Sequence, residues 1–174
     1  MSRDSAGGPT AVLIGSPGAG KSSVGRRVAK RLGVRFVDSD RLIERTAGMS
    51  VADIFVSQGE DAFRAMEEEA VAAALAEPGG VLSLGGGAVM REATRQRLRD
   101  HRVIWLKVSL GDAASRVGLN TARPLLLGNV RGTLKALMDE RAPMYEEVAT
   151  AVVDTSDRTI GQVVDEVVEV IGRG

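Results

Sequence analysis

Residues 15–23 have the composition and spacing of a loop that binds phosphate groups. The segment matches the pattern G-x-x-x-x-G-K-[ST], with Gly15, Gly20, Lys21 and Ser22 at its fixed positions. In such a loop the glycines let backbone N–H groups point inward at phosphate oxygens. The lysine can reach the outer phosphates, and the serine hydroxyl can bind Mg²⁺. The segment therefore predicts a binding site for a nucleoside triphosphate.

Two carboxylates stand where they could act on that nucleotide. Asp38 and Asp40 follow a predicted strand, and ligands of an open parallel sheet bind beyond the carboxyl ends of its strands. One carboxylate can help to hold hydrated Mg²⁺, and the other can accept a proton from an attacking hydroxyl group. The alternative is that Asp40 only caps a helix that begins at Arg41.

Arg141 is predicted to lie on the buried face of a helix over Val130–Val148. It falls four residues after Leu137 and four before Tyr145, which is helical spacing. A buried guanidinium needs an anionic partner, because an unpaired buried charge is costly. That partner is either a structural carboxylate or an anionic substrate.

Arg64 and the run Gly85-Gly86-Gly87 have two interpretations each. Arg64 flanks an apolar helical stripe, but Glu67 and Glu68 lie three and four residues on, so an ion pair within the helix would also explain it. Three glycines after a buried strand favour close approach of a ligand to the backbone, and a tight turn is the alternative.

The composition indicates a single globular domain and excludes several classes of protein. The chain has 174 residues, 44% of them hydrophobic, and a formal net charge of zero, which argues against a general nucleic-acid binder. It has no cysteine and one histidine, His101, so thiolate and multi-histidine metal sites are excluded. Residues 1–10 are polar and glycine-rich, and are predicted to form a disordered tail rather than a signal peptide. With no apolar stretch long enough to span a bilayer, we expect a cytoplasmic protein.

Apolar runs alternate with helix-like segments along the rest of the chain, which predicts a parallel sheet covered on both faces. The expected strands are 11–14, 34–37, 81–84, 103–108 and 150–153. The stretch between the second and third is longer than one crossover helix needs. Gly48 and Gly59 divide it into three short helices, a natural place for a second substrate. Residues 118–128, with glycine at both ends and Pro124 inside, are either a mobile flap or an ordinary connection.

Taken together, these motifs resemble shikimate kinase, in particular the actinobacterial type. The resemblance covers residues 11–174 and is carried by segments 15–23, 38–40, 63–64, 84–89, 122–126 and 141–145. It implies phosphorylation of the 3-hydroxyl of shikimate by ATP with Mg²⁺, in a monomer that binds neither nucleic acid nor membrane. It also implies one α/β domain with a five-stranded parallel sheet in the order 2-3-1-4-5, a substrate-binding helical insertion at about 39–76 and a lid at about 118–128.

The resemblance further implies roles for single residues. The nucleotide would be bound by Gly18, Ala19, Gly20, Lys21, Ser22, Ser23, Arg116, Arg123 and Arg158. Shikimate would be bound by Asp40, Arg64, Gly85, Gly86, Gly87 and Arg141. The metal would be held by Ser22 with Asp38, and the catalytic residues would be Lys21, Asp40 and Arg123. The sequence departs from close relatives at Ile160, where they have a proline that packs on adenine. A related kinase for a carboxylated polyol such as gluconate is the alternative function, and a nucleotide-binding protein without turnover is a less favoured one.

Overall fold

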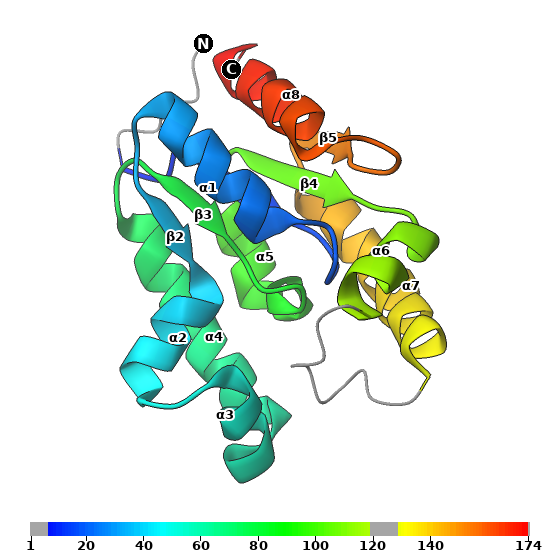
Figure 1. The fold of residues 1–174 in the computed structure, drawn as a ribbon. Helices are drawn as coiled ribbons and strands as arrows, with labels where there is room; N and C mark the ends of the chain where they lie inside the picture. The colour runs from blue at the N-terminus through cyan, green and yellow to red at the C-terminus, as the bar shows by residue number, and fades with distance from the viewer. Residues whose placement is uncertain (1–6, 119–128, 174) are drawn as a thin grey trace.

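The computed structural model describes residues 7–118 and 129–173, and its centre is a five-stranded sheet (Figure 1). All pairings are parallel, in the order β2-β3-β1-β4-β5. The strands are β1 (Ala11–Ile14), β2 (Phe36–Asp38), β3 (Val81–Ser83), β4 (Val103–Lys107) and β5 (Ala151–Asp154). The strand order confirms the prediction, and the strand ends lie within two residues of the predicted ones, with both ends of β1 as predicted.

Helices cover both faces of this sheet. In Figure 1, α1 and α8 lie on one face, and α4, α5 and α7 lie on the other. The helices are α1 (Lys21–Leu32), α2 (Ser39–Ala47), α3 (Val51–Gln58), α4 (Glu60–Ala76), the 3-10 turn η1 (Ala88–Met90), α5 (Glu92–Leu98), α6 (Leu110–Gly118), α7 (Val130–Val148) and α8 (Ile160–Arg173). No described helix is both long and apolar enough to cross a membrane.

The central strand β1 shows why the apolar runs are continuous. Ala11 and Leu13 pack into the core beneath α1 and α8, whereas Val12 and Ile14 pack into the core on the opposite face. Successive side chains of a strand point to opposite faces of the sheet, so both sets of positions must be apolar when both faces are covered. The two cores hold the ends of the strands in fixed positions, and the site is built at those ends.

The helical insertion forms a small core of its own. Ile43 of α2, Ile54 of α3 and Phe63 of α4 are buried together. Helices α2 and α3 end at Gly48 and Gly59, as predicted. However, α4 has 17 residues and is not short, because its later turns also cover the sheet through Val71 and Leu75.

The first turn of α2 shows which residue caps this helix, and so tests the prediction that Asp40 is the cap. The helix begins at Ser39 rather than Arg41, and its capping residue is Asp38, whose Oδ1 accepts a hydrogen bond from the Asp40 N–H at 2.9 Å. The capping interpretation of Asp40 is therefore wrong. Asp38, two residues earlier, already satisfies the helix terminus, and the Asp40 side chain lines a pocket.

The residues just before β1 pair with the loop that precedes β3. Thr10 N–H donates to the Gly80 carbonyl at 2.8 Å, and Gly79 N–H donates to the Gly8 carbonyl at 3.1 Å. Gly8 lies so close to the His101 ring that a Cβ there would be 2.6 Å from Cε1. Burial lowers the pKa of His101 below 6.5, and Asp100 partly opposes the shift.

This burial makes part of the stability dependent on pH. Because the folded-state pKa of His101 is depressed, protonation favours the unfolded chain, so stability is lost as the pH falls below about 6.5. We expect His101→Gln to show a shallower loss of thermal stability between pH 7 and pH 5 than the parent protein. Melting temperatures across this range check it, and parallel curves would contradict it.

Candidate active site

The predicted phosphate loop joins β1 to the start of α1. Gly18 has φ 84°, in the left-handed region that favours glycine, and a Cβ there would lie 2.8 Å from the Ala113 carbonyl oxygen. The Lys21 Nζ donates to the carbonyl oxygens of Gly15 and Ser16, at 2.8 and 3.1 Å. The Lys21 side chain therefore folds back over its own loop, and its ammonium group lies where phosphate groups are expected to bind.

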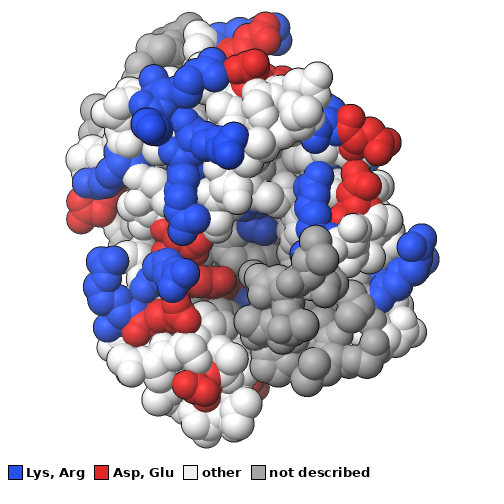
Figure 2. Space-filling view, viewed as in Figure 1, with Lys and Arg blue, Asp and Glu red and all other residues white. Residues whose placement is uncertain are grey.

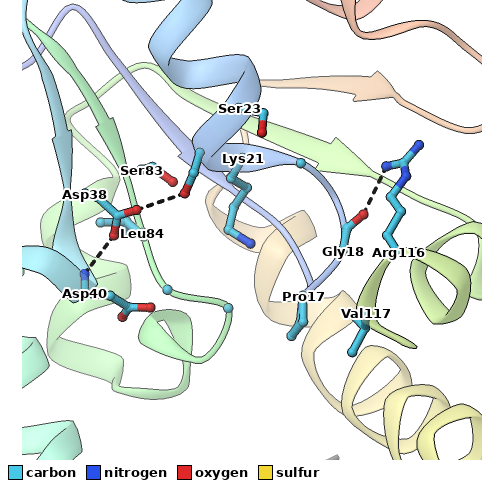
Figure 3. A pocket seen from close by; sticks show the side chains of 14 residues that line it. Pro17, Gly18, Lys21, Ser23, Asp38, Asp40, Ser83, Leu84, Arg116 and Val117 are labelled. Carbon is cyan, nitrogen blue, oxygen red and sulfur yellow. Dashed lines mark hydrogen bonds between the residues drawn. The ribbon is translucent and has the colours of Figure 1, made fainter. Parts of the chain in front are cut away.

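Ser22, Asp38 and Asp40 line the same pocket beside this loop, and Figure 3 shows the two carboxylates. The Ser22 hydroxyl donates to Asp38 Oδ2 at 2.8 Å, which joins the start of α1 to the end of β2. The Asp40 side chain lines the same pocket, from the first turn of α2. The two carboxylates predicted to face the nucleotide are thus brought together, with the serine predicted to bind metal between Asp38 and the loop.

These groups line one open pocket of about 330 Å³. Its lining comprises Pro17, Gly18, Gly20, Lys21, Ser22, Ser23, Asp38, Asp40, Ser83, Leu84, Gly85, Gly86, Arg116 and Val117. Lys and Arg side chains gather over α1, and acidic side chains lie towards α2 (Figure 2). Since α1 contains only basic charged residues, it adds to the attraction of this face for a polyphosphate.

A second pocket of about 310 Å³ adjoins the first at Gly20, Ser23 and Arg116. Arg158 and Ile160 line it as well. The guanidinium groups of Arg116 and Arg158 donate hydrogen bonds to backbone carbonyl oxygens. Arg116 donates to Gly18 and Thr155, and Arg158 donates to Asp154 and Gln162. Arg116, Arg158 and Ile160, which the family resemblance connects with the nucleotide, therefore surround one space at the end of the phosphate loop.

Arg64 and Glu67 form a buried ion pair on α4. Arg64 is 8% exposed and Glu67 is 2% exposed, and the Arg64 Nη1 to Glu67 Oε1 distance is 2.7 Å. The ion pair considered from sequence is thus present with Glu67, whereas Glu68 pairs with Arg97. Burial raises the pKa of Glu67, and nearby Arg64 opposes that rise. Glu67 Oε2 has no hydrogen-bond partner among the described residues, so the pair retains an unsatisfied oxygen.

Arg141 is buried without a carboxylate partner. It is 5% exposed, and within residues 7–118 and 129–173 no acidic side chain lies within 4.0 Å of it. Its Nε has no hydrogen-bond partner in the same part of the chain. Of the two partners predicted for this guanidinium, a structural carboxylate at ion-pair distance is therefore absent from the described residues, and the anionic substrate stays a prediction. The carboxylate of Glu67 is near enough for Arg141 to oppose the rise in its pKa.

The three consecutive glycines lie against the site residues. A Cβ on Gly85 would be 2.8 Å from Asp40 Oδ1, and one on Gly86 would be 3.3 Å from Arg141 Nη1. A Cβ on Gly87 would overlap the Arg64 guanidinium. The segment also turns, since the Ala88 N–H donates to the Gly85 carbonyl at 3.1 Å. The tight-turn interpretation of the glycine run is therefore correct, whereas the approach of a ligand to this backbone stays a prediction. Side chains at these positions would occupy the space between the arginines and Asp40.

Sequence reasoning missed two residues of this site. Glu67 lies four residues after Phe63 and four before Val71, so helical spacing could have placed it on the buried face. Helical spacing and the family resemblance assign no separate role to Tyr145, but its hydroxyl donates to the Gly86 carbonyl oxygen. No local signal predicts that bond, because the two residues are 59 positions apart. The predicted lid, 118–128, and its Arg123 lie outside the described residues, apart from Gly118 at the end of α6.

Comparison with known proteins agrees with this site. The sequence profile of the family described as "Shikimate kinase" matches residues 17–172. The shikimate kinase of Thermobifida fusca is 61% identical over 151 residues, which cover 87% of this chain and 88% of the relative. A solved structure of shikimate kinase from Acinetobacter baumannii in complex with shikimate superposes with a TM-score of 0.87 at 32% identity, covering 95% of this chain and 93% of that one. A gluconokinase from Sinorhizobium meliloti shares the fold alone, with a TM-score of 0.62 at 20% identity over 94% of this chain and 91% of that one. The chain belongs to the shikimate kinase family.

Proposed function

We propose that this protein transfers the γ-phosphoryl group of ATP to the 3-hydroxyl of shikimate. The observation that carries the proposal is a pair of buried arginines, Arg64 and Arg141, that flank a glycine loop next to a phosphate-binding loop. A carboxylate between two guanidinium groups would supply the negative charge that Arg141 lacks. Gluconate also carries a carboxylate, but the gluconokinase likeness supports only the fold.

The nucleotide would run from the phosphate loop to the second pocket. Loop amides and Lys21 would hold its phosphates, while Arg116 and Arg158 would contact the base together with Ile160. Phosphoryl transfer depends chiefly on positioning and on neutralising charge. Arg123 belongs to the segment expected to act as a lid. When the site closes, its guanidinium would lie beside the phosphoryl group being transferred and stabilise the negative charge there.

Ser22 and Asp38 would hold Mg²⁺, and their chemistry fits that ion. Magnesium prefers oxygen ligands and retains most of its waters, so one hydroxyl and one nearby carboxylate are a suitable donor set beside phosphate oxygens. Bound there, it would neutralise charge on the β- and γ-phosphates. Asp40, in the same pocket, would hold the ring hydroxyls of shikimate and accept the proton of the attacking one.

Asp38→Asn should raise the Mg²⁺ concentration needed for half-maximal activity by about tenfold or more, as expected for a residue that orients a metal ligand. The asparagine Oδ1 can still cap α2, so the melting temperature should change little. Activity is titrated with MgCl₂ at saturating ATP and shikimate. Asp61→Asn, an exposed change on α4, is the control. An unchanged magnesium requirement would remove Asp38 from the metal site.

A substrate panel tests the proposed reaction. ADP release is measured with shikimate, with gluconate and without an acceptor, and the phosphorylated product is identified by phosphorus NMR. We expect release that depends on shikimate and a single 3-phosphate product. Faster turnover of gluconate, or ADP release independent of shikimate, would contradict the assignment.

We further propose that the protein works as a monomer in the cytoplasm. Lys21, Asp40, Arg64 and Arg141 come from one chain and meet around one glycine loop, so the described part of the site needs no second subunit. Sedimentation equilibrium at working concentration checks the monomer.

A further inference from the structure

The backbone of the glycine loop has an incomplete set of hydrogen bonds. The Gly85 N–H donates to the Ser39 hydroxyl at 3.0 Å, and the Gly85 carbonyl accepts from the Ala88 N–H at 3.1 Å. The Gly86 carbonyl accepts from the Tyr145 hydroxyl, and the Gly87 carbonyl accepts from the Met90 N–H at 3.0 Å. In the described part of the chain, the N–H groups of Gly86 and Gly87 have no such acceptor.

The unpaired amide of Gly87 is unusual, because this residue is buried and nearly all buried backbone N–H groups of a native protein have partners. Gly86 is partly exposed and lines the open pocket. Here the amides belong to the residues that lie against Arg141 and Arg64, respectively. Consecutive backbone N–H groups form a concave site for anions. The loop and the two guanidinium groups thus offer one set of donors to one anionic group.

Tyr145 controls the orientation of one of these amides. In a trans peptide the C=O and the following N–H point in opposite directions, so a hydrogen bond that holds the Gly86 carbonyl also sets the direction of the Gly87 N–H. Glycine backbone resists rotation least, so this peptide needs an external restraint. The Tyr145 ring is itself fixed, being 2% exposed and packed against Trp105 with ring centroids 5.6 Å apart. Its hydroxyl remains a donor at neutral pH, because burial raises the pKa of Tyr145 to about 12, with Arg141 opposing the rise.

We propose that Tyr145 is a positioning residue for the substrate, which holds the Gly86–Gly87 peptide so that the Gly87 N–H donates to the shikimate carboxylate beside Arg64 and Arg141. This inference rests on the proposed function, since it assumes that shikimate is the anion. What it adds is the role of Tyr145, a residue that need not contact the substrate but that sets the direction of the Gly87 N–H.

Tyr145→Phe tests the proposal, because it removes one oxygen atom and keeps the ring. We expect the dissociation constant for shikimate to rise about three- to tenfold, which corresponds to one lost neutral hydrogen bond. The dissociation constant for ATP, and the turnover number at saturating shikimate, should stay within about twofold of the parent values. Calorimetric titration of both ligands and steady-state kinetics measure these quantities.

Trp105→Phe is the matched control, since it alters packing on the same ring and retains the hydroxyl bond. It should lower the melting temperature without weakening shikimate binding. The spectroscopic readout is the ¹⁵N-glycine NMR spectrum. Shikimate should shift the Gly86 and Gly87 amide resonances of the parent protein, and the Gly87 shift should be reduced in Tyr145→Phe.

Three results would overturn the positioning role: unchanged shikimate affinity in Tyr145→Phe, equal weakening by Trp105→Phe, or a Gly87 resonance that shikimate does not move. These differ from failure of the proposed function, in which the parent protein itself would not bind shikimate in the same titration.

Discussion

Lys21→Ala is expected to lower the turnover number by at least about 10²–10³-fold, the usual cost of removing one preorganised group that stabilises charge in a transition state. The ammonium lies within the phosphate loop, over the carbonyl oxygens of Gly15 and Ser16. The neighbouring lining residues Ser22 and Arg116 cannot take its place, because Ser22 carries no charge and Arg116 is held by Gly18 and Thr155.

The fold should survive this change. Lys21 is only partly buried and belongs to none of the apolar cores, so the free energy of unfolding should change by about 1 kcal/mol or less. Activity and thermal unfolding are measured on the same preparation. Lys30→Ala removes the same charge from an exposed position on α1 and should retain activity. Near-normal turnover by Lys21→Ala would mean that this loop is not the ATP site.

Arg141→Ala is expected to weaken shikimate binding by about 2–5 kcal/mol, or roughly 30- to several-thousand-fold in the dissociation constant. The guanidinium is buried and has no carboxylate partner in the described part of the chain. A bidentate pair with a carboxylate is directional and charge-assisted, so Arg141→Lys should restore only part of the affinity. ATP affinity should be nearly unchanged, because the phosphate loop lies on other elements.

Stability separates this result from a structural role. Removing a buried charge that has no carboxylate within ion-pair distance among the described residues should leave the melting temperature of the ligand-free protein unchanged or raise it. Arg131→Ala, an exposed change in the first turn of α7, is the control for loss of charge. Calorimetric titration of both ligands is compared with melting curves. Lower stability with unchanged shikimate affinity would show that Arg141 serves the fold.

Local sequence was sufficient to predict the nucleotide half of the site. The phosphate loop is contiguous, and the strand before it has the predicted boundaries, Ala11–Ile14. Asp38 and Asp40 could be placed at the same edge because parallel strands end together. The buried position of Arg141 followed from helical spacing within one element.

Only the tertiary structure could decide what those residues face. Whether Arg141 meets a protein carboxylate depends on segments far away in sequence, and the choice of Asp38 rather than Asp40 as the cap depends on where α2 leaves β2. The bond from Tyr145 to Gly86 joins α7 to the loop after β3. Spacing along one helix or strand predicts which face a side chain occupies. The partner on that face is set by the packing of distant elements, which for this protein brings two arginines, an aspartate and three glycines into one site.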